Sequence, residues 1–361
     1  MSPADGPRGR VRKRPVTVVV VEGNKTQRAL LCRVLQAEGD IEVVGMATTA
    51  DEAVAVVKAT APKVVTLDLQ IDGGGINAIT ELVRTRTTPV LVLSVAVQGA
   101  WATRAVDALA AGAAEVLPKP IRWDDAAQRG LRDEIRRLAG VRVRPAATTA
   151  VVNPPARQSG SEPSVPPDRL VAIAASTGGP VALAHVLSKL DGVNAPVLVV
   201  QHLHPDFVTG FVSWIGKSSA LPVKAATHGE RLKGGVVYIA PGGVHLRVGV
   251  SSTVVLDPSP DDAIHRPSAD ELFHSVAANA GAHAVGVLLT GMGADGAAGL
   301  LAIQAAGGTT IAQDEATSAV YGMPRAAAKL GAAGRVLPLD RIGEAVVAAC
   351  GRPRRDAKPK P

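Results

Sequence analysis

Short β-branched runs alternate with longer Ala- and Leu-rich amphipathic stretches from residue 16 onward, and this alternation limits the possible folds more than any other feature. Helices with apolar residues at helical spacing are expected near residues 24–38, 50–59, 76–86, 99–111 and 123–139. Repeated strand–helix pairs are typical of a parallel sheet with helices on both faces. The sequence therefore predicts a doubly wound, flavodoxin-like α/β domain in this part of the chain.

The alternation stops between residues 139 and 168, which collect Pro, Ser, Thr and Ala without periodicity, as in a linker. A second alternating segment follows, with helices expected near residues 180–190, 206–216, 269–280, 297–306 and 340–350. Short β runs with tight turns between residues 222 and 256 predict a hairpin inserted beside a parallel sheet. The second domain is therefore predicted to be a Rossmann-like α/β domain with an inserted β-hairpin.

The composition of the 361-residue chain fits two folded domains with polar tails, because a hydrophobic content of 47% is enough for two cores. The predicted division is a basic tail (1–14), a first domain (15–138), a linker (139–168), a second domain (169–350) and a basic tail (351–361). Most of the net charge of +7 lies in the tails, so the folded body is close to neutral. Solvated termini are the simplest interpretation of these tails, although basic tails can touch acidic lipid or nucleic acid.

Aromatic content, the cysteines and the first apolar run indicate which partners and which compartment to expect. Aromatic residues make up only 2% of the chain, so a surface for stacking bases is lacking and specific nucleic-acid binding is not expected. Cys32 and Cys350 are too few for a disulfide framework and lack metal-ligand spacing, which favours a reducing compartment. The apolar run 16–21 is too short for a signal peptide or a transmembrane segment, so a cytoplasmic protein is expected.

Four polar residues end strands of the first domain: Glu22, Asp68, Ser94 and Lys119. The carboxyl ends of parallel strands meet at one edge of the sheet, where reactive groups collect. An acceptor carboxylate, a second carboxylate for Mg²⁺, a hydroxyl and a lysine are the groups needed to receive a phosphoryl group. The sequence thus predicts a phosphoacceptor site with Asp68 as the acceptor.

The layout resembles the receiver domain of bacterial response regulators, with Asp68 at the acceptor position and Lys119 at the end of the fifth strand. That resemblance implies a histidine kinase as phosphoryl donor and Mg²⁺ as cofactor. The family usually has two adjacent acids after the first strand, whereas this chain has Glu22 and Gly23, and Val116 replaces the usual aromatic switch residue. A working phosphoacceptor with weakened Mg²⁺ binding and a domain kept for its fold and interface both remain open.

Polar residues also follow predicted strands of the second domain. Ser176 and His202 come directly after two of these strands, and Asp295 lies in the turn after a third. A hydroxyl, an imidazole and a carboxylate at one edge can act as nucleophile, general base and the group that orients the base. Backbone N–H groups near Thr177 precede a helix start, and those near Met292 lie in a Gly-rich turn, so both are candidates for holding an oxyanion.

Each of these residues also has a simpler interpretation. Ser176 before two glycines can be a helix cap or part of a phosphate cradle. His202 can be a hydrogen-bonded structural residue, and the nearby His204 has the same chemistry. Asp295 can cap the helix that begins beside it. The joint arrangement, rather than any one residue, favours a catalytic site.

Six longer segments then carry a specific resemblance, in order across residues 170–330: AASTGGP, VVQHLHPDF, YIAPGGVHL, HRPSADELFHS, LLTGMGADGAAGL and YGMPRAA. They resemble the CheB family, the protein-glutamate methylesterases of bacterial chemotaxis. The resemblance implies a cofactor-free serine hydrolase with the triad Ser176, His202 and Asp295. It also implies hydrolysis of glutamyl methyl esters on chemoreceptors, deamidation of glutamines in many members, and a receiver domain that controls access to the active site.

Arg266 in HRPS and Met323 in YGMP match family positions near the active face, as substrate-side or framework residues. The chain departs from the family pattern at Leu203-His204, where relatives often have Met-Pro. This difference concerns the substrate groove and the receptor preference. Two other functions remain open at this point. The chain can be a non-enzymatic signalling adaptor, or the same hydrolase can act on a protein other than a chemoreceptor.

Overall fold

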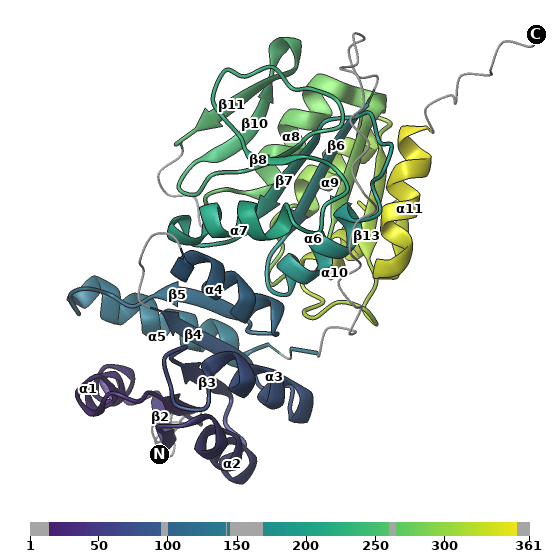
Figure 1. The fold of residues 1–361 in the computed structure, drawn as a ribbon. Helices are drawn as coiled ribbons and strands as arrows, with labels where there is room; N and C mark the ends of the chain where they lie inside the picture. The colour runs from purple at the N-terminus through teal and green to yellow at the C-terminus, as the bar shows by residue number, and fades with distance from the viewer. Residues whose placement is uncertain (1–13, 95–99, 142, 145–168, 260–264, 352–361) are drawn as a thin grey trace, which may run out of the picture.

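The computed structural model describes residues 14–94, 100–141, 143–144, 169–259 and 265–351, which form two α/β domains (Figure 1). Most of the predicted linker and tails lies outside these residues. The first domain comprises β1 (Val16–Val21), α1 (Lys25–Gln36), β2 (Ile41–Ala47), α2 (Ala50–Thr60), β3 (Val64–Leu67), α3 (Gly75–Thr85), β4 (Val90–Ser94), α4 (Ala100–Ala110), β5 (Glu115–Pro118) and α5 (Asp125–Ala139). Its sheet has the order β2-β1-β3-β4-β5 and is parallel throughout, which confirms the predicted flavodoxin-like fold.

The second domain also has a parallel sheet, with the strand order β14-β13-β12-β6-β7-β9-β8. Its elements are β6 (Leu170–Ala175), α6 (Gly179–Leu187), β7 (Val197–Gln201), η1 (Pro205–Phe207), α7 (Val208–Ile215), β8 (Val223–Ala225), β9 (Val237–Ile239), β10 (His245–Gly249), η2 (Val250–Ser252), β11 (Thr253–Asp257), α8 (Ala269–Ala280), η3 (Gly281–His283), β12 (Ala284–Leu288), α9 (Ala297–Ala305), β13 (Thr309–Gln313), α10 (Met323–Leu330), β14 (Arg335–Leu337) and α11 (Leu339–Cys350). The order changes direction around β6, where a doubly wound sheet places its binding crevice.

The inserted hairpin is present but smaller than the sequence predicts. β10 and β11 pair in antiparallel fashion, whereas β8 and β9 pair in parallel and belong to the main sheet. The prediction of a hairpin across residues 222–256 is therefore wrong for these two strands. The sequence-based prediction also missed α10 and β14, although Pro324 in the first turn of α10 and Gly331 after its last turn are the usual helix signals.

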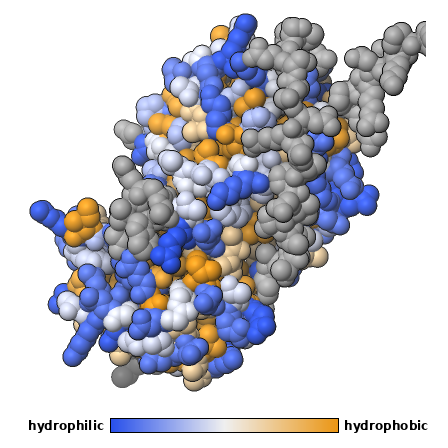
Figure 2. All heavy atoms as spheres, in the orientation of Figure 1, coloured by the Kyte–Doolittle hydropathy of each residue, from blue (hydrophilic) through white to orange (hydrophobic). Residues whose placement is uncertain are grey.

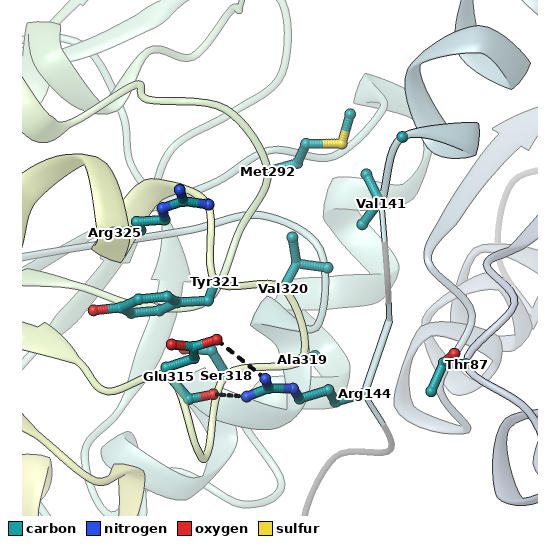
Figure 3. Close-up of a pocket in the computed structure, with 12 residues that line it drawn as sticks. Thr87, Val141, Arg144, Met292, Glu315, Ser318, Ala319, Val320, Tyr321 and Arg325 are labelled. Atoms are coloured by element: carbon teal, nitrogen blue, oxygen red, sulfur yellow. Dashed lines mark hydrogen bonds and ion pairs between the residues drawn. The ribbon is translucent and has the colours of Figure 1, made fainter.

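The domains contact each other through α4 of the first domain, which packs against α6, η1 and α7 of the second (Figure 1), and Arg137 of α5 also contacts Met292. Phe207 of η1 is buried in the core of the first domain, and Val106 of α4 is buried in the core of the second. On the α5 side, Met292 and Val320 of the second domain pack against the first domain's core, and Figure 3 shows both near Val141. Each core is thus completed by side chains of the other domain.

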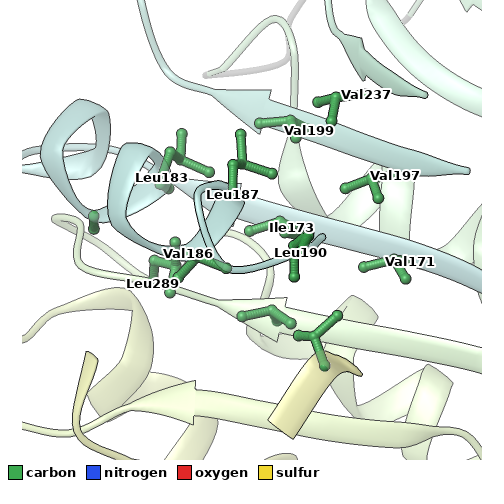
Figure 4. Close-up of a cluster of buried hydrophobic side chains, with 14 of the residues drawn as sticks. Val171, Ile173, Leu183, Val186, Leu187, Leu190, Val197, Val199, Val237 and Leu289 are labelled. Atoms are coloured by element: carbon green, nitrogen blue, oxygen red, sulfur yellow. The ribbon is translucent and has the colours of Figure 1, made fainter. Parts of the chain in front are cut away.

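Side chains of β6 alternate between the two faces of the second sheet. Val171 and Ile173 pack with α6, α7 and α11, as Figure 4 shows for part of this cluster. Ala172 and Ala174 face the opposite side, where α8, α9, α10 and β10 pack. Burial of these apolar faces stabilises the sheet and holds its strand ends in fixed positions.

Figure 2 shows hydrophilic and hydrophobic side chains interspersed over the drawn face of both domains. Among the described residues, none of the helices has the length and apolar character needed to cross a membrane.

Packing of α8 against α9 depends on Gly299, where an added Cβ would lie 2.6 Å from the Phe273 Cβ and 2.9 Å from the Asp270 carbonyl oxygen. We expect Gly299→Ala to force these helices apart and destabilise the second domain by about 1–3 kcal/mol. Calorimetric melting of the full chain measures this. Gly130→Ala is the control, because no atom lies within 4 Å of its added Cβ. Equal melting temperatures for both variants would contradict the packing argument.

Candidate active site

Three neighbouring strands, β12, β6 and β7, bring the predicted residues of the second domain to one edge of the sheet. Ala175 is the register partner of Gln201, so Ser176 and His202 follow directly at adjacent strand ends. The His202 N–H donates to the Ala175 carbonyl over 3.0 Å. Asp295 lies in the turn between β12 and α9, on the other side of β6. The common edge that the strand pattern predicts is therefore present.

His202 and Asp295 are in direct contact. The His202 Nε2 lies 2.8 Å from the Asp295 Oδ2, and both side chains are only 10% exposed. A carboxylate accepts a hydrogen bond here, so Nε2 carries the proton and Nδ1 has a free lone pair. Nδ1 is buried, and no hydrogen bond joins it to Ser176 or to any other described residue. The imidazole therefore has an unused acceptor, as a general base requires.

Asp295 is held by the N-terminus of α8. Its carboxylate accepts hydrogen bonds from the Ser268 hydroxyl (2.8 Å) and from the N–H groups of Ala269 (2.7 Å) and Asp270 (3.0 Å). Burial alone would raise the pKa of Asp295, but hydrogen bonds from His202 and these N–H groups outweigh it and hold the pKa well below its usual range. Asp295 thus stays ionised beside the imidazole. It does not cap α9, the helix that begins beside it, since the N-cap of α9 is Gly296.

Ser176 lies in the tight turn between β6 and α6. Its N–H donates to the Thr290 carbonyl, and its carbonyl accepts from the Gly179 N–H. Gly178 has a φ of 75°, a left-handed conformation that glycine adopts without a steric penalty. An added Cβ on Gly291 would lie 2.8 Å from the Ser176 Cβ, so only glycine allows the turn after β12 to come this close to the serine.

The backbone N–H groups of Thr177 and Met292 donate no hydrogen bond to any described residue. Thr177 directly follows Ser176, and Met292 directly follows Gly291. Ser176 and Gly291 lie close together, so these two N–H groups belong to neighbouring turns. Two unused donors on turns that meet at Ser176 are suited to hold the oxyanion that forms when a hydroxyl attacks a carbonyl.

Gln201 is a site residue that sequence reasoning missed. Its Nε2 donates to the carbonyl oxygens of Ser176 and His202, each over 2.9 Å, and the side chain is buried. One amide group thus fixes the backbone at both strand ends. Its position directly before His202 was visible in the sequence, but nothing in the pattern indicated that its side chain turns back across the edge.

A second missed group links three loops around the site. The Thr290 hydroxyl donates to the Thr177 carbonyl (2.9 Å) and accepts from the Val320 N–H (2.9 Å). The Gln313 Oε1 accepts from the Thr290 N–H over 2.8 Å. These buried bonds hold the turns that carry Thr177 and Met292 against the loop before α10.

The structure also places the two other family positions, Met323 and Arg266. Met323 is fully buried in the core beneath α10, next to Gly291. The Arg266 guanidinium donates to the Pro258 carbonyl over 3.2 Å, near the end of the hairpin.

The four predicted residues of the first domain also meet. Lys119 forms ion pairs with Glu22 (2.8 Å) and with Asp68, and both acids are buried. Ser94 is buried at the end of β4, and its carbonyl accepts from the Lys119 N–H over 2.6 Å. The structure thus brings two carboxylates and one lysine together at the edge where the sequence predicts them.

This cluster offers Mg²⁺ two carboxylates, whereas Mg²⁺ prefers an octahedral set of oxygen ligands. The lysine contacts one oxygen of each carboxylate, and the other oxygens accept backbone N–H groups of Asn24 and Gln70, each over 3.0 Å. Gly23 supplies no third carboxylate. Across the described ranges, no group of three or more His, Cys, Asp and Glu side chains is placed to hold a metal ion.

Contacts between the domains reach the candidate active site. Arg137 of α5 donates from Nη1 to the Met292 Sδ over 3.1 Å and forms ion pairs with Glu115 and Glu134. Beside it, a cavity of about 590 Å³ lies between the end of α5 and the loop 315–322 (Figure 3). Thr87 and Met292 line it from opposite domains, so a molecule in this cavity would touch both.

Comparison with known proteins identifies the family of each domain. Residues 171–346 match the family model for the CheB methylesterase domain, and residues 18–129 match that for the response regulator receiver domain. The protein-glutamate methylesterase/protein-glutamine glutaminase 2 of Anaeromyxobacter dehalogenans is 43% identical over 347 residues, which cover 92% of this chain and 96% of the relative. The enzyme of the same name from Pseudomonas aeruginosa is 37% identical over 343 residues, or 94% and 98% of the two chains.

Among solved structures, the catalytic domain of the Thermotoga maritima CheB methylesterase is similar to this chain, with 38% identity, a TM-score of 0.48 and coverage of 50% of this chain and 97% of that one. The two family models and the full-length relatives together cover both domains. The chain therefore belongs to the family of protein-glutamate methylesterases/protein-glutamine glutaminases that carry a receiver domain.

Proposed function

We propose that this chain hydrolyses methyl esters of glutamyl side chains on a methylated chemoreceptor, and also deamidates glutamine side chains, with Ser176 as the nucleophile. The observation that carries this proposal is the buried His202–Asp295 pair at the strand end next to Ser176. Full-length relatives named for both activities support the choice of substrate.

In the proposed mechanism, the His202 Nδ1 takes the Ser176 proton as the hydroxyl oxygen attacks the ester carbonyl. The N–H groups of Thr177 and Met292 hold the oxyanion, and Asp295 balances the charge of the imidazolium. The imidazolium returns the proton to the leaving methoxide, and methanol departs. Water, deprotonated by His202, then releases the glutamate and frees the serine. Such hydrogen bonds between nucleophile and base are often open until substrate binds, which agrees with the unused Nδ1.

We also propose that the receiver domain limits activity through Arg137. Met292 supplies one of the proposed oxyanion donors, and its side chain packs against the receiver's core and contacts Arg137. A receiver held against this turn restricts the approach of a protein substrate. The proposed substrate enters when the domains separate, with phosphorylation of Asp68 by a histidine kinase as the trigger that the family implies.

Loss of the nucleophile or the base should abolish the activity. We expect Ser176→Ala and His202→Gln each to lower the release of methanol from methylated receptor by about a thousandfold or more. His204→Gln is the matched control, because His204 is half-exposed and its Nδ1 lies 3.5 Å from the Asp206 carboxylate. Wild-type rates in the Ser176→Ala protein would disprove the triad. Loss of activity in His204→Gln alone would make His204 the base.

Removal of Arg137 should loosen the contact between the domains. We expect Arg137→Ala to raise the basal esterase rate about fivefold or more, because the Met292 turn is released from the receiver. Arg136→Ala is the control on the same helix, since its ion-pair partners among the described residues, Glu38, Asp40 and Asp133, all belong to the first domain. An unchanged or lower rate in Arg137→Ala, measured by methanol release, would contradict this role.

The missing acid of the receiver can be restored. An added Cβ on Gly23 would meet only the Thr48 carbonyl oxygen, at 3.8 Å. We expect Gly23→Asp to bind Mg²⁺ more tightly than wild type in calorimetric titration, and to gain Mg²⁺-dependent labelling by acetyl phosphate. Gly23→Asp combined with Asp68→Asn should lose that label. Failure of Gly23→Asp to bind Mg²⁺ more tightly than wild type would contradict this prediction.

A further inference from the structure

A second histidine lies flat against His202. The ring centroids of His202 and His265 are 4.3 Å apart, and the two planes differ by only 12°. His265 precedes Ser268 by three residues in the segment that leads into α8. The Ser268 hydroxyl and the first N–H groups of α8 donate hydrogen bonds to Asp295. The contacts that fix the carboxylate therefore also bring the His265 ring over the imidazole.

The hydrogen bond to Asp295 does not by itself fix the plane of the His202 ring. The outer side-chain torsion of histidine has broad minima, so a ring bonded at one nitrogen can still turn about its attachment. A second flat ring against its face limits this rotation. The lone pair of Nδ1 lies in the ring plane, so the plane decides whether that lone pair meets the Ser176 hydroxyl.

We propose that His265 is a positioning residue, whose ring stacks on His202 and orients the Nδ1 lone pair toward the nucleophile. This inference rests on the proposed function, because it assumes that His202 is the base for Ser176. It assigns His265 no proton transfer and no contact with the reacting atoms.

His265 must be uncharged for this role, since a second cation would oppose the imidazolium that forms on His202. Burial, and then the neighbouring His202, lower the pKa of His265 to about 4, so the ring is neutral near pH 7. The other charged groups that act on it are Asp295 of the site and Arg137 and Glu134 of α5. A neutral aromatic face can lie against a cation without repulsion.

The test compares three substitutions of His265 in the full-length chain. Phe keeps a flat ring without nitrogen, Gln keeps hydrogen-bonding groups without a ring, and Ala removes both. We expect Gln and Ala to lower kcat about tenfold to a hundredfold with little change in KM, because a small misplacement of the base is costly. His265→Phe should retain most of the wild-type kcat.

A second measurement is the rate at which a fluorophosphonate labels Ser176, which needs the activated serine but no natural substrate. We expect the same ranking of variants, with Phe close to wild type and with His283→Ala, an exposed residue of η3, as the unaffected control. A Phe variant as slow as Gln, or a Gln variant as fast as wild type, would overturn the stacking role. Melting temperatures identify an Ala variant that fails to fold, and the Phe and Gln pair then decides.

The two proposals fail in different ways. If wild type labels at Ser176 but releases no methanol from methylated receptor, the proposed substrate is wrong and the ranking of His265 variants still tests the positioning. If methanol release depends on Ser176 while all His265 variants keep wild-type kcat and labelling rates, the proposed function stands and the positioning role is disproved.

Discussion

The carboxylate of Asp295 is the group on which the second domain's site depends. It is buried, accepts hydrogen bonds from the N-terminus of α8, and binds the imidazole of His202. A buried charge is stable only when such partners surround it. The same contacts join the turn after β12, the start of α8 and the end of β7. Removing this carboxylate would therefore disturb the position of three segments as well as the chemistry of one histidine.

Around this pair, neutral hydrogen bonds set the remaining geometry. Gln201 ties the strand ends that carry Ser176 and His202, and Thr290 ties the turn at Thr177 to the loop before α10. These bonds are buried, so each would cost about 1–3 kcal/mol to leave unsatisfied. The two proposed oxyanion donors lie on segments held in this way, which agrees with a site that is formed before substrate arrives.

Much of the fold could be predicted because parallel α/β domains repeat one pattern, and their strand ends share an edge. That rule placed Ser176, His202 and Asp295 together, and likewise Asp68 and Lys119. It could not find Gln201 or His265, because their contacts depend on side-chain direction and on how α8 docks. The strands β8 and β9 were assigned to the hairpin for a related reason. Each has three residues, and so short a sequence does not indicate which strand it pairs with.

The exchange of Phe207 and Val106 between the two cores has an energetic consequence for opening. Pulling the domains apart exposes these side chains to water, at a cost of about 1.5–3 kcal/mol for each large apolar group. The hydrophobic effect thus favours the form in which the two domains are in contact, without any ligand. Separation of the domains would therefore expose an apolar surface formed by α4 and η1.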